Sequence, residues 1–333
     1  MNSNWHKMML LGALFIGVGF LNTKTAHDTV RAEPRISNLV SIEATRLSPQ
    51  QTLAINRLEN RRLAAPLPVS RLQAFAPAGG GPIEVTQKEA TLPITALLVL
   101  VTDLDTGERF YEYDADRRWP LASLSKMMTA VVATRLVSSS ELITIADADF
   151  NPLDTSTNHA LKVDQQYVAS DLVRAMLVAS ANEAAEALIR SYGREKFIEE
   201  MRRQAVLWGM TETYFGDPTG LSAANQSTPD DLEIFLGHLW REYPELLEIS
   251  RSPNIRLKEW RSGGTVTLYA THRFAGEGNF LGGKTGYTDT AKENLISIFR
   301  VAGRPIAIIV MASDERFTDT TRLLDLVRAR LSP

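Results

Sequence analysis

The sequence contains no cysteine. This absence excludes disulfide bonds, a catalytic thiolate, cysteine-ligated metals and the attachment of a lipid to a cysteine. An excess of charge of either sign is also missing, because 36 basic and 39 acidic residues leave a formal net charge of −3 at pH 7. Without a dense run of lysine or arginine that could follow a phosphate backbone, we expect no nucleic-acid partner.

The amino-terminal apolar segment is too short to cross a bilayer as an ordinary helix. Residues 8–21 form an apolar run of about 14 residues, whereas a spanning helix needs about 20. A histidine and a lysine precede the run, and no acidic residue occurs before Asp28. This layout is typical of a secretory signal or short anchor rather than of a core helix, so we expect export to the periplasm or cell envelope. Two outcomes stay open: cleavage after Ala26 or Ala32, or retention of residues 8–21 as an anchor in the inner membrane. An uncleaved anchor is the only membrane contact that we expect.

Composition divides the chain into three parts. Residues 1–26 are the expected signal peptide or anchor. Residues 27–91 have mixed charge and few aromatic residues, with Ala, Pro and Gly concentrated over 65–82, so we expect a mostly irregular linker there. Residues 92–333 carry the regular hydrophobic patterns of one folded domain.

Hydrophobic periodicity in this domain predicts strands at both ends and helices between them. The expected strands cover 94–101, 107–113, 282–288, 295–301 and 306–312. The expected helices cover 123–136, 170–178, 181–192, 195–208, 229–240 and 318–331. This order requires a sheet assembled from distant parts of the chain, together with a helical subdomain, and therefore an α+β fold.

The first candidate catalytic motif is Ser-Leu-Ser-Lys at residues 123–126. A lysine three residues after Ser123, at the start of a predicted helix, places the Lys126 amine within reach of the serine hydroxyl, where it can act as a base. Capping of the helix is the alternative role for Ser123. Apolar residues on both sides of the motif would fix the serine at the end of a buried element, which favours catalysis.

The second motif, S-x-N, is formed by Ser180 and Asn182 between two predicted helices. Its alternative role is to satisfy the backbone groups of helix ends. Residues 252–254 repeat the pattern, but they include a proline and no helix is expected after them. We therefore select Ser180 and Asn182.

The third motif is K-T-G, formed by Lys284, Thr285 and Gly286 on a predicted strand. No upstream glycine pattern or following helix supports a phosphate-binding loop. A solvated lysine at a sheet edge is the alternative interpretation. Gly286 favours a functional one, because a residue without a side chain lets a substrate backbone approach and pair with the strand.

In this order the three motifs resemble those of the penicillin-recognising serine hydrolases, whose S-x-x-K, S-x-N and K-T-G boxes form one active site. The flanking residues resemble more closely the low-molecular-mass D-alanyl-D-alanine carboxypeptidases and endopeptidases. They are ASLSKMMTA at 122–130, DPTGL at 217–221 with Ser227, Thr228, Asp231 and Leu232, and GKTGYT at 283–288. The resemblance covers residues 94–331 and implies a β-lactamase/transpeptidase-like α+β fold with an antiparallel sheet flanked by helices.

The resemblance implies a serine peptidase that hydrolyses D-Ala-D-Ala type bonds in peptidoglycan stem peptides and is acylated by β-lactam antibiotics. Neutral Lys126, its charged form disfavoured by burial and by Lys284, would take the proton of Ser123. Backbone N–H groups of Ser123 and Tyr287 would form the oxyanion hole. Ser180 would pass a proton to the leaving amine.

Substrate binding is implied for the remaining motif residues. Asn182 would hold Lys126 and a substrate amide, while Lys284 and Thr285 would bind a carboxylate of the substrate or of a β-lactam. The implied substrate-binding residues are Asn182, Lys284, Thr285, Gly286 and Tyr287. No H-E-x-x-H or comparable cluster suggests a metal, and we expect no cofactor.

Two departures from the family pattern bear on substrate preference. Where the family usually has Ala-Gly after the third motif, this chain has Ala291 and Lys292, and the bulky charged residue beside the K-T-G strand is expected to alter preference. We also expect neither the β-rich carboxy-terminal domain nor the basic amphipathic tail of larger carboxypeptidases. This short form resembles the endopeptidase branch more closely.

Three rival functions can be weighed from the sequence. A class A β-lactamase needs a glutamate with an asparagine shortly after it between the second and third motifs, and the nearest candidate, Glu212, lacks that asparagine. A catalytically inactive penicillin-binding sensor or scaffold would usually have lost the nucleophile or the base, whereas Ser123 and Lys126 are both present. A Ser-His-Asp hydrolase is opposed by the absence of G-x-S-x-G.

Overall fold

The computed structural model describes residues 83–87, 90–152, 154 and 159–332. The chain divides into two units, Met1–Leu47 and Ser48–Pro333, and every described residue lies in the second. The expected export segment and most of the expected linker fall outside the described residues. Within the described part of the chain, no helix combines the length and the apolar character that crossing a membrane requires.

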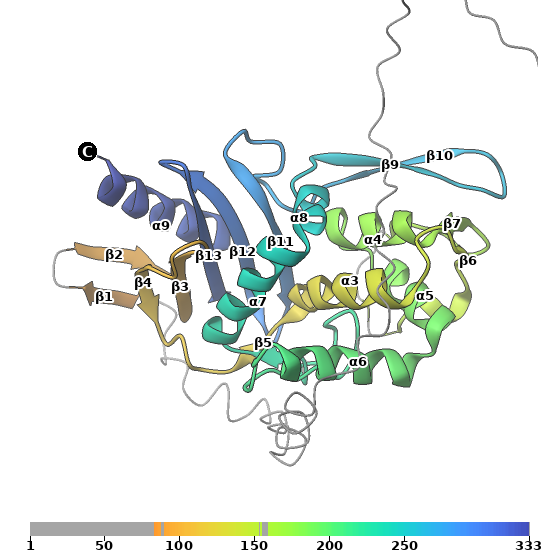
Figure 1. The fold of residues 1–333 in the computed structure, drawn as a ribbon, viewed down its shortest axis with the longest axis horizontal. Helices are drawn as coiled ribbons and strands as arrows, with labels where there is room; N and C mark the ends of the chain where they lie inside the picture. Colours follow the sequence, from red (N-terminus) through yellow and green to blue (C-terminus); the bar gives the residue numbers. More distant parts are fainter. Residues whose placement is uncertain (1–82, 88–89, 153, 155–158, 333) are drawn as a thin grey trace, which may run out of the picture. The chain divides into compact units, whose positions relative to one another are not determined.

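A five-stranded antiparallel sheet forms the centre of the domain (Figure 1). Its strands, in spatial order, are β11 (Phe280–Thr288), β12 (Lys292–Val301), β13 (Arg304–Ser313), β3 (Leu98–Asp103) and β4 (Arg109–Tyr113). The pairing of β13 with β3 joins strands from opposite ends of the domain. The expected assembly from distant parts of the chain is therefore confirmed.

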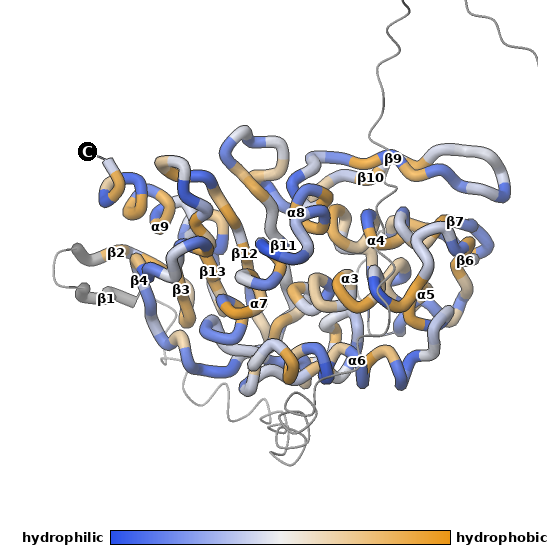
Figure 2. The backbone as a smooth tube through the Cα atoms, viewed as in Figure 1, coloured by the Kyte–Doolittle hydropathy of each residue, from blue (hydrophilic) through white to orange (hydrophobic). Residues whose placement is uncertain are grey.

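The central strands are apolar on both faces because each face packs on its own hydrophobic cluster. In β3, Leu98 and Leu100 belong to one cluster, whereas Val99 and Val101 belong to the other. Helix α9 (Arg316–Leu331) packs on β12 and β13 and closes the second cluster. Figure 2 shows the resulting hydrophobic character along β12 and β13.

The other helices lie on the opposite face and form the helical subdomain (Figure 1). They are α3 (Ser125–Leu136), α4 (Ala169–Val178), α5 (Asn182–Tyr192), α6 (Arg194–Leu207), α7 (Pro229–Glu242) and α8 (Pro244–Ser250). The first nine residues of α3 are all buried, including three polar ones. A helix packed on every side shows no apolar stripe, so α3 is the core helix of the subdomain.

Several short elements were not predicted. They are β1 (Ile83–Gln87), β2 (Ala90–Ile94), β5 (Trp119–Pro120), β6 (Leu142–Thr144), β7 (Gln166–Val168), β8 (Gln226–Ser227), β9 (Asn254–Lys258), β10 (Thr265–Tyr269), and the 3₁₀ turns η1 (Ala122–Leu124) and η2 (Asp147–Asp149). Strand β1 lies inside the range expected to be a linker, so regular structure begins before residue 92.

The single strand expected at 94–101 is wrong. The chain leaves one strand at Ile94 and enters the next at Leu98. Between them, the backbone N–H groups of Thr95 and Ala96 donate to the carboxylate of Asp319 in α9, at 3.0–3.2 Å. A break in the ladder is tolerated here because the buried carboxylate accepts the bonds that a neighbouring strand would otherwise receive.

Candidate active site

The S-x-x-K motif lies on a tight turn at the start of α3. Ser123 is the middle residue of η1, and the residue that caps α3 is Leu124, so the alternative role of Ser123 as the helix cap is wrong. The amine of Lys126 donates to Ser123 Oγ at 2.8 Å, as the three-residue spacing predicts, and to the carbonyl oxygen of Thr219 at 2.7 Å. Ala122, before the serine, has a left-handed φ of 49°. Strain of this kind persists only where the surroundings fix it.

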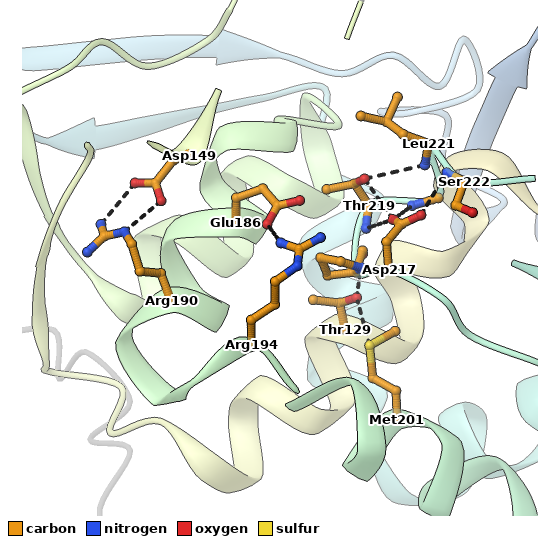
Figure 3. A network of polar contacts seen from close by, with 12 residues as sticks. Thr129, Asp149, Glu186, Arg190, Arg194, Met201, Asp217, Thr219, Leu221 and Ser222 are labelled. Atoms are coloured by element: carbon orange, nitrogen blue, oxygen red, sulfur yellow. Dashed lines mark hydrogen bonds and ion pairs between the residues drawn. The ribbon is translucent and has the colours of Figure 1, made fainter. Parts of the chain in front are cut away.

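The loop at residues 217–221 supplies part of that support. Oδ1 of Asp217 accepts hydrogen bonds from the backbone N–H groups of Thr219 and Gly220 at 2.7 and 2.6 Å, and its Oδ2 accepts one from Ser222 N at 2.7 Å (Figure 3). Gly220 has a φ of +86°, and a Cβ there would lie 1.8 Å from the carbonyl oxygen of Ala122. The loop thus needs glycine at this position, where its backbone packs directly on the turn that carries the serine.

Asn225 joins this loop to the nucleophile turn. Its Nδ2 donates to Ser125 Oγ and to the carbonyl oxygen of Asp217, both at 2.8 Å, and Ser125 Oγ donates to the Ala122 carbonyl at 2.9 Å. Asn225 is fully buried. A buried amide with these bonds holds the two segments in one relative position.

Ser180 and Lys284 form a second serine–lysine pair. Ser180 lies between α4 and α5 with a left-handed φ of 59°. The Lys284 amine donates to Ser180 Oγ at 2.8 Å and to the carbonyl oxygen of Thr285 at 2.9 Å. Although β11 is an edge strand, Lys284 is only 1% exposed. The alternative of a solvated edge lysine is therefore wrong.

The third motif packs against the first. A Cβ on Gly286 would lie 2.9 Å from the carbonyl oxygen of Leu121 and 3.3 Å from the backbone nitrogen of Leu124, so a side chain there would push β11 away from η1. Asn294, on the neighbouring strand, donates to the carbonyl oxygens of Pro120 and Leu121 at 2.8 and 3.1 Å. The sheet and the nucleophile turn are joined by these contacts.

Asn182 does not hold Lys126 as expected. Its Nδ2 donates to Oδ2 of Asp154 at 2.7 Å, and the Lys126 amine is bonded instead to Ser123 and Thr219. Figure 3 shows how α5, which begins at Asn182, is held further along by the ion pair of Arg190 with Asp149.

The pKa values of Lys126 and Lys284 are both lowered, because the surroundings destabilise the charged form of each amine. Burial lowers the pKa of Lys126 to about 8, although the carboxylates of Asp217 and Asp154 act in the opposite direction. Burial also lowers the pKa of Lys284 well below its ordinary value, and the positive charges of Lys126 and Arg316 add to that effect. Burial, one of the two causes that we expected for Lys126, is the largest cause of its shift.

A cleft of about 570 Å³ collects the motif residues. Ser123, Ser180, Asn182, Thr285, Gly286 and Tyr287 all line it, and Lys126 and Lys284 are buried beneath it as partners of the two serines. The size is typical of a ligand-binding cleft. Gly220, Leu221 and Thr288, from the flanking signatures, also line the cleft. The lining residues that the sequence interpretation missed are Asp154, Ala160, Ala179, Ala181, Glu183, Thr271, Asp289, Thr290 and Arg316.

The rival candidates from the sequence lie outside the cleft. Glu212 accepts a hydrogen bond from Arg118 at 2.8 Å and does not line the cleft. Ser252 and Asn254, the second S-x-N, lie between α8 and β9 and are not among the lining residues. Among the described residues, no group of three or more His, Cys, Asp or Glu side chains is placed to hold a metal.

The fold and the site together define a serine hydrolase with two serine–lysine pairs facing one cleft. The particular family follows from comparison with known proteins: the model of the D-alanyl-D-alanine carboxypeptidase family matches residues 84–315, and the chain belongs to this family. The predicted family, α+β fold and hydrolase class are confirmed.

Individual relatives agree with this assignment. The D-alanyl-D-alanine endopeptidase of Pseudomonas aeruginosa is 30% identical over 232 residues, which are 67% of this chain and 74% of the relative. That of Escherichia coli is 28% identical, covering 75% and 82% of the two chains. The structure of penicillin-binding protein D2 from Listeria monocytogenes, in the cefotaxime-bound form, matches with 30% identity and a TM-score of 0.62, over 72% of this chain and 99% of that one.

Proposed function

We propose that this D,D-peptidase cleaves the bond after a D-Ala residue of peptidoglycan stem peptides through an acyl-enzyme on Ser123, and that β-lactams acylate the same serine. The observation that carries the proposal is the 2.8 Å bond between the Lys126 amine and Ser123 Oγ at the cleft. The cefotaxime- and ampicillin-bound structures of the Listeria relative support the β-lactam part.

Acylation begins when neutral Lys126 takes the proton of Ser123. With a pKa of about 8, roughly one tenth of Lys126 is neutral at pH 7. The hydroxyl oxygen then attacks the substrate carbonyl. The backbone N–H groups of Ser123 and Tyr287 stabilise the oxyanion, each worth about 3–4 kcal/mol. The close packing of Gly286 on the nucleophile turn supports this pairing of donors from η1 and β11.

The second serine–lysine pair serves the leaving group. Because the Lys284 amine donates to Ser180 Oγ, the hydroxyl proton of Ser180 remains available for another acceptor. We infer that this proton goes to the leaving amine, and that the proton which Lys126 took from Ser123 replaces it on Ser180. Water then releases the acyl group from Ser123.

The substrate carboxylate binds beside Thr285, with Arg316 as the permanent cation. We expected Lys284 to supply this charge, but its burial disfavours the charged form. Arg316 lines the cleft, and its Nη1 donates to the carbonyl oxygen of Gly286 at 2.8 Å. A guanidinium stays protonated and can form two parallel bonds to a carboxylate, which suits this task.

We propose cross-linked stem peptides as the main substrate, because the Pseudomonas and Escherichia relatives are named endopeptidases. Lys292, which we expected to alter substrate preference, does not line the cleft. It has a left-handed φ of 56°, and its amine bonds to Asp314 Oδ1 at 2.9 Å. Carboxypeptidase activity on uncross-linked peptides is the second candidate, supported by the family and by relatives of that name.

Export to the cell envelope belongs to the same proposal, since peptidoglycan lies outside the inner membrane. The segment that would direct it, residues 1–26, lies outside the described residues, as does the anchor expected at 8–21. Separation of membrane and soluble envelope fractions, followed by the mass of the mature chain, distinguishes an anchored protein from a cleaved one.

The proposal is tested by incubating the purified protein and its Ser123→Ala variant with a labelled penicillin and measuring intact mass. We expect a stable adduct on the parent alone. A folded parent that forms no adduct would refute the acylating serine, and rapid turnover of a chromogenic cephalosporin would favour a β-lactamase. Cross-linked and uncross-linked muropeptides then separate endopeptidase from carboxypeptidase activity.

A further inference from the structure

A β-bulge on β11 precedes the third motif. Phe280 pairs with Phe299 of β12, but Gly282 pairs with Ile298, so β11 has one extra residue between the two pairs. Because successive side chains of a strand point to opposite faces, one extra residue turns every side chain after it to the other face. The bulge therefore decides which face of the sheet Lys284 enters.

The register after the bulge points Lys284 at Ser180. Lys284 pairs with Ile296, which belongs to the cluster covered by the helical subdomain, and its amine donates to Ser180 Oγ at 2.8 Å. Without the extra residue, Lys284 would pair with Leu295 and share its face, which belongs to the cluster that α9 closes. The amine would then face apolar side chains instead of the second serine.

Ser250, the last residue of α8, holds the bulge from the face of the helical subdomain. Helix α8 packs on β11 (Figure 1). Ser250 Oγ accepts the backbone N–H of Gly283 at 3.0 Å and donates to the carbonyl oxygen of Leu247 at 2.9 Å, and the residue is only 3% exposed. Gly282 has a φ of +139°, and a Cβ there would lie 2.8 Å from Ser250 Oγ. The buried hydroxyl thus gives the backbone at the bulge a hydrogen-bond partner outside the sheet.

His272 holds the same backbone from the opposite face, where its ring packs on Phe280 with 4.4 Å between the ring centres. Its Nε2 lies 3.1 Å from the carbonyl oxygen of Ile296 and 3.1 Å from Ser297 Oγ. A Cβ on Gly283 would lie 2.9 Å from this nitrogen, so the imidazole crosses β11 at Gly283 to reach β12. A carbonyl oxygen only accepts hydrogen bonds, so Nε2 carries the hydrogen.

The other nitrogen of His272 shows that packing alone does not account for a histidine here. Nδ1 is buried and has no hydrogen-bond partner among the described residues. Burial also lowers the pKa of His272 to about 3, so the ring is neutral. An apolar side chain of similar size would avoid the cost of the unpaired nitrogen. What the histidine adds is the bond from Nε2 to Ile296, the strand partner of Lys284.

We propose that Ser250 and His272 are positioning residues for the peptidase reaction, which fix the bulge at Gly282 and so keep the Lys284 amine on Ser180. Neither of the two side chains lines the cleft, so both act through β11. The inference rests on the proposed function, in which Ser180 gives its proton to the leaving group. Loss of the positioning should therefore slow reactions whose leaving group needs a proton and spare those whose leaving group needs none.

The experiment compares two acylation reactions of the full chain. A labelled penicillin leaves through its ring nitrogen, which must be protonated, whereas a thioester of a D-Ala peptide releases a thiolate without a proton. The variants are Ser250→Ala, His272→Ala, His272→Gln, Ser180→Ala and the double variant Ser180→Ala/Ser250→Ala. Ser191→Ala is the control, because Ser191 Oγ also donates to a carbonyl three residues earlier in the last turn of a helix, but on the surface. Unfolding curves show which variants fold.

Ser180→Ala sets the scale, since loss of the proton donor should slow acylation by penicillin about 100-fold or more but acylation by the thioester less than about 3-fold. Ser250→Ala and His272→Ala should each slow the penicillin reaction about 10-fold and the thioester reaction less than about 2-fold. His272→Gln should stay within about 3-fold of the parent, because its amide N–H can still donate to Ile296. In the Ser180→Ala background, Ser250→Ala should change the penicillin rate by less than about 2-fold, and Ser191→Ala should match the parent.

Equal losses with penicillin and the thioester in Ser250→Ala would overturn the inference, because the bulge would then affect the site as a whole. An undiminished Ser250→Ala loss in the Ser180→Ala background would also overturn it, as would parent rates in both Ser250→Ala and His272→Ala. If His272→Ala does not fold, Ser250→Ala and His272→Gln carry the comparison. A folded parent that penicillin does not acylate, or a Ser180→Ala variant that loses equally with both reagents, would instead refute the proposed function on which the inference rests.

Discussion

Replacing Gly220 with alanine tests whether its contact with the nucleophile turn positions Ser123. The new Cβ would start 1.8 Å from the carbonyl oxygen of Ala122, at a φ of +86°. Both contacting groups are backbone, so relief requires the loop and the turn to separate by about 1 Å, a misplacement that costs about 100-fold in rate. This equals about 2.7 kcal/mol of transition-state stabilisation.

Gly209 provides a matched control. Its φ is +82°, and a Cβ there would meet nothing within 4 Å. Both alanine variants carry the conformational cost of a left-handed residue, about 1–2 kcal/mol of stability. Only Gly220→Ala also displaces the serine.

The assay is the rate of acylation by a labelled penicillin, with thermal unfolding followed in parallel. We expect both variants to lose stability, but Gly209→Ala to be acylated within about 2-fold of the parent rate. Acylation of Gly220→Ala at the parent rate would refute the argument that the loop positions Ser123. An equal loss in both variants would also refute it, because general destabilisation would then explain the loss.

Three further predictions follow from the site and the core. The proposed mechanism uses the neutral form of Lys126, whose pKa is lowered to about 8, so acylation should rise with pH between about 7 and 9 and then level off; a flat profile there contradicts the proposed role of Lys126 as base. Arg316→Ala should raise KM about 10-fold or more for a peptide with a free carboxyl terminus, but much less for its amide, and equal effects would remove Arg316 from carboxylate binding. Asp319→Ala leaves buried donors from Thr95, Ala96 and Ser313 without an acceptor, so urea unfolding should show a loss of about 3 kcal/mol, and a loss below about 1 kcal/mol would contradict this.

Local spacing was enough to predict the contact within the first motif. A lysine three positions after a serine is within bonding reach in any helical turn, so the contact between Lys126 and Ser123 follows from the sequence itself. The long helices and four of the five strands of the central sheet were predicted for the same reason, since their periodicity repeats over many residues. The roles of these residues stay predictions until acylation is measured.

Residues without a local pattern were missed. Arg316 and Asp154 reach the cleft from α9 and from the segment after η2, and no spacing in the sequence relates either one to a motif. For Asn182, the position in the cleft was predicted from the sequence, but its hydrogen-bond partner was not. Such partners depend on tertiary packing, which brings together segments that are far apart in the chain.

Backbone strain explains why motifs alone do not guarantee activity. Ala122, directly before one serine, and Ser180 both adopt left-handed conformations that L-residues avoid, at φ of 49° and 59°. Such conformations persist only where surrounding bonds fix them. At the first serine those bonds come from Asn225 and from the loop that contains Gly220. A chain could therefore keep all three motifs and still lose its activity through substitutions at these supporting residues. An inactive relative is better recognised by changes at the residues that hold the strained backbone than by changes in the motifs.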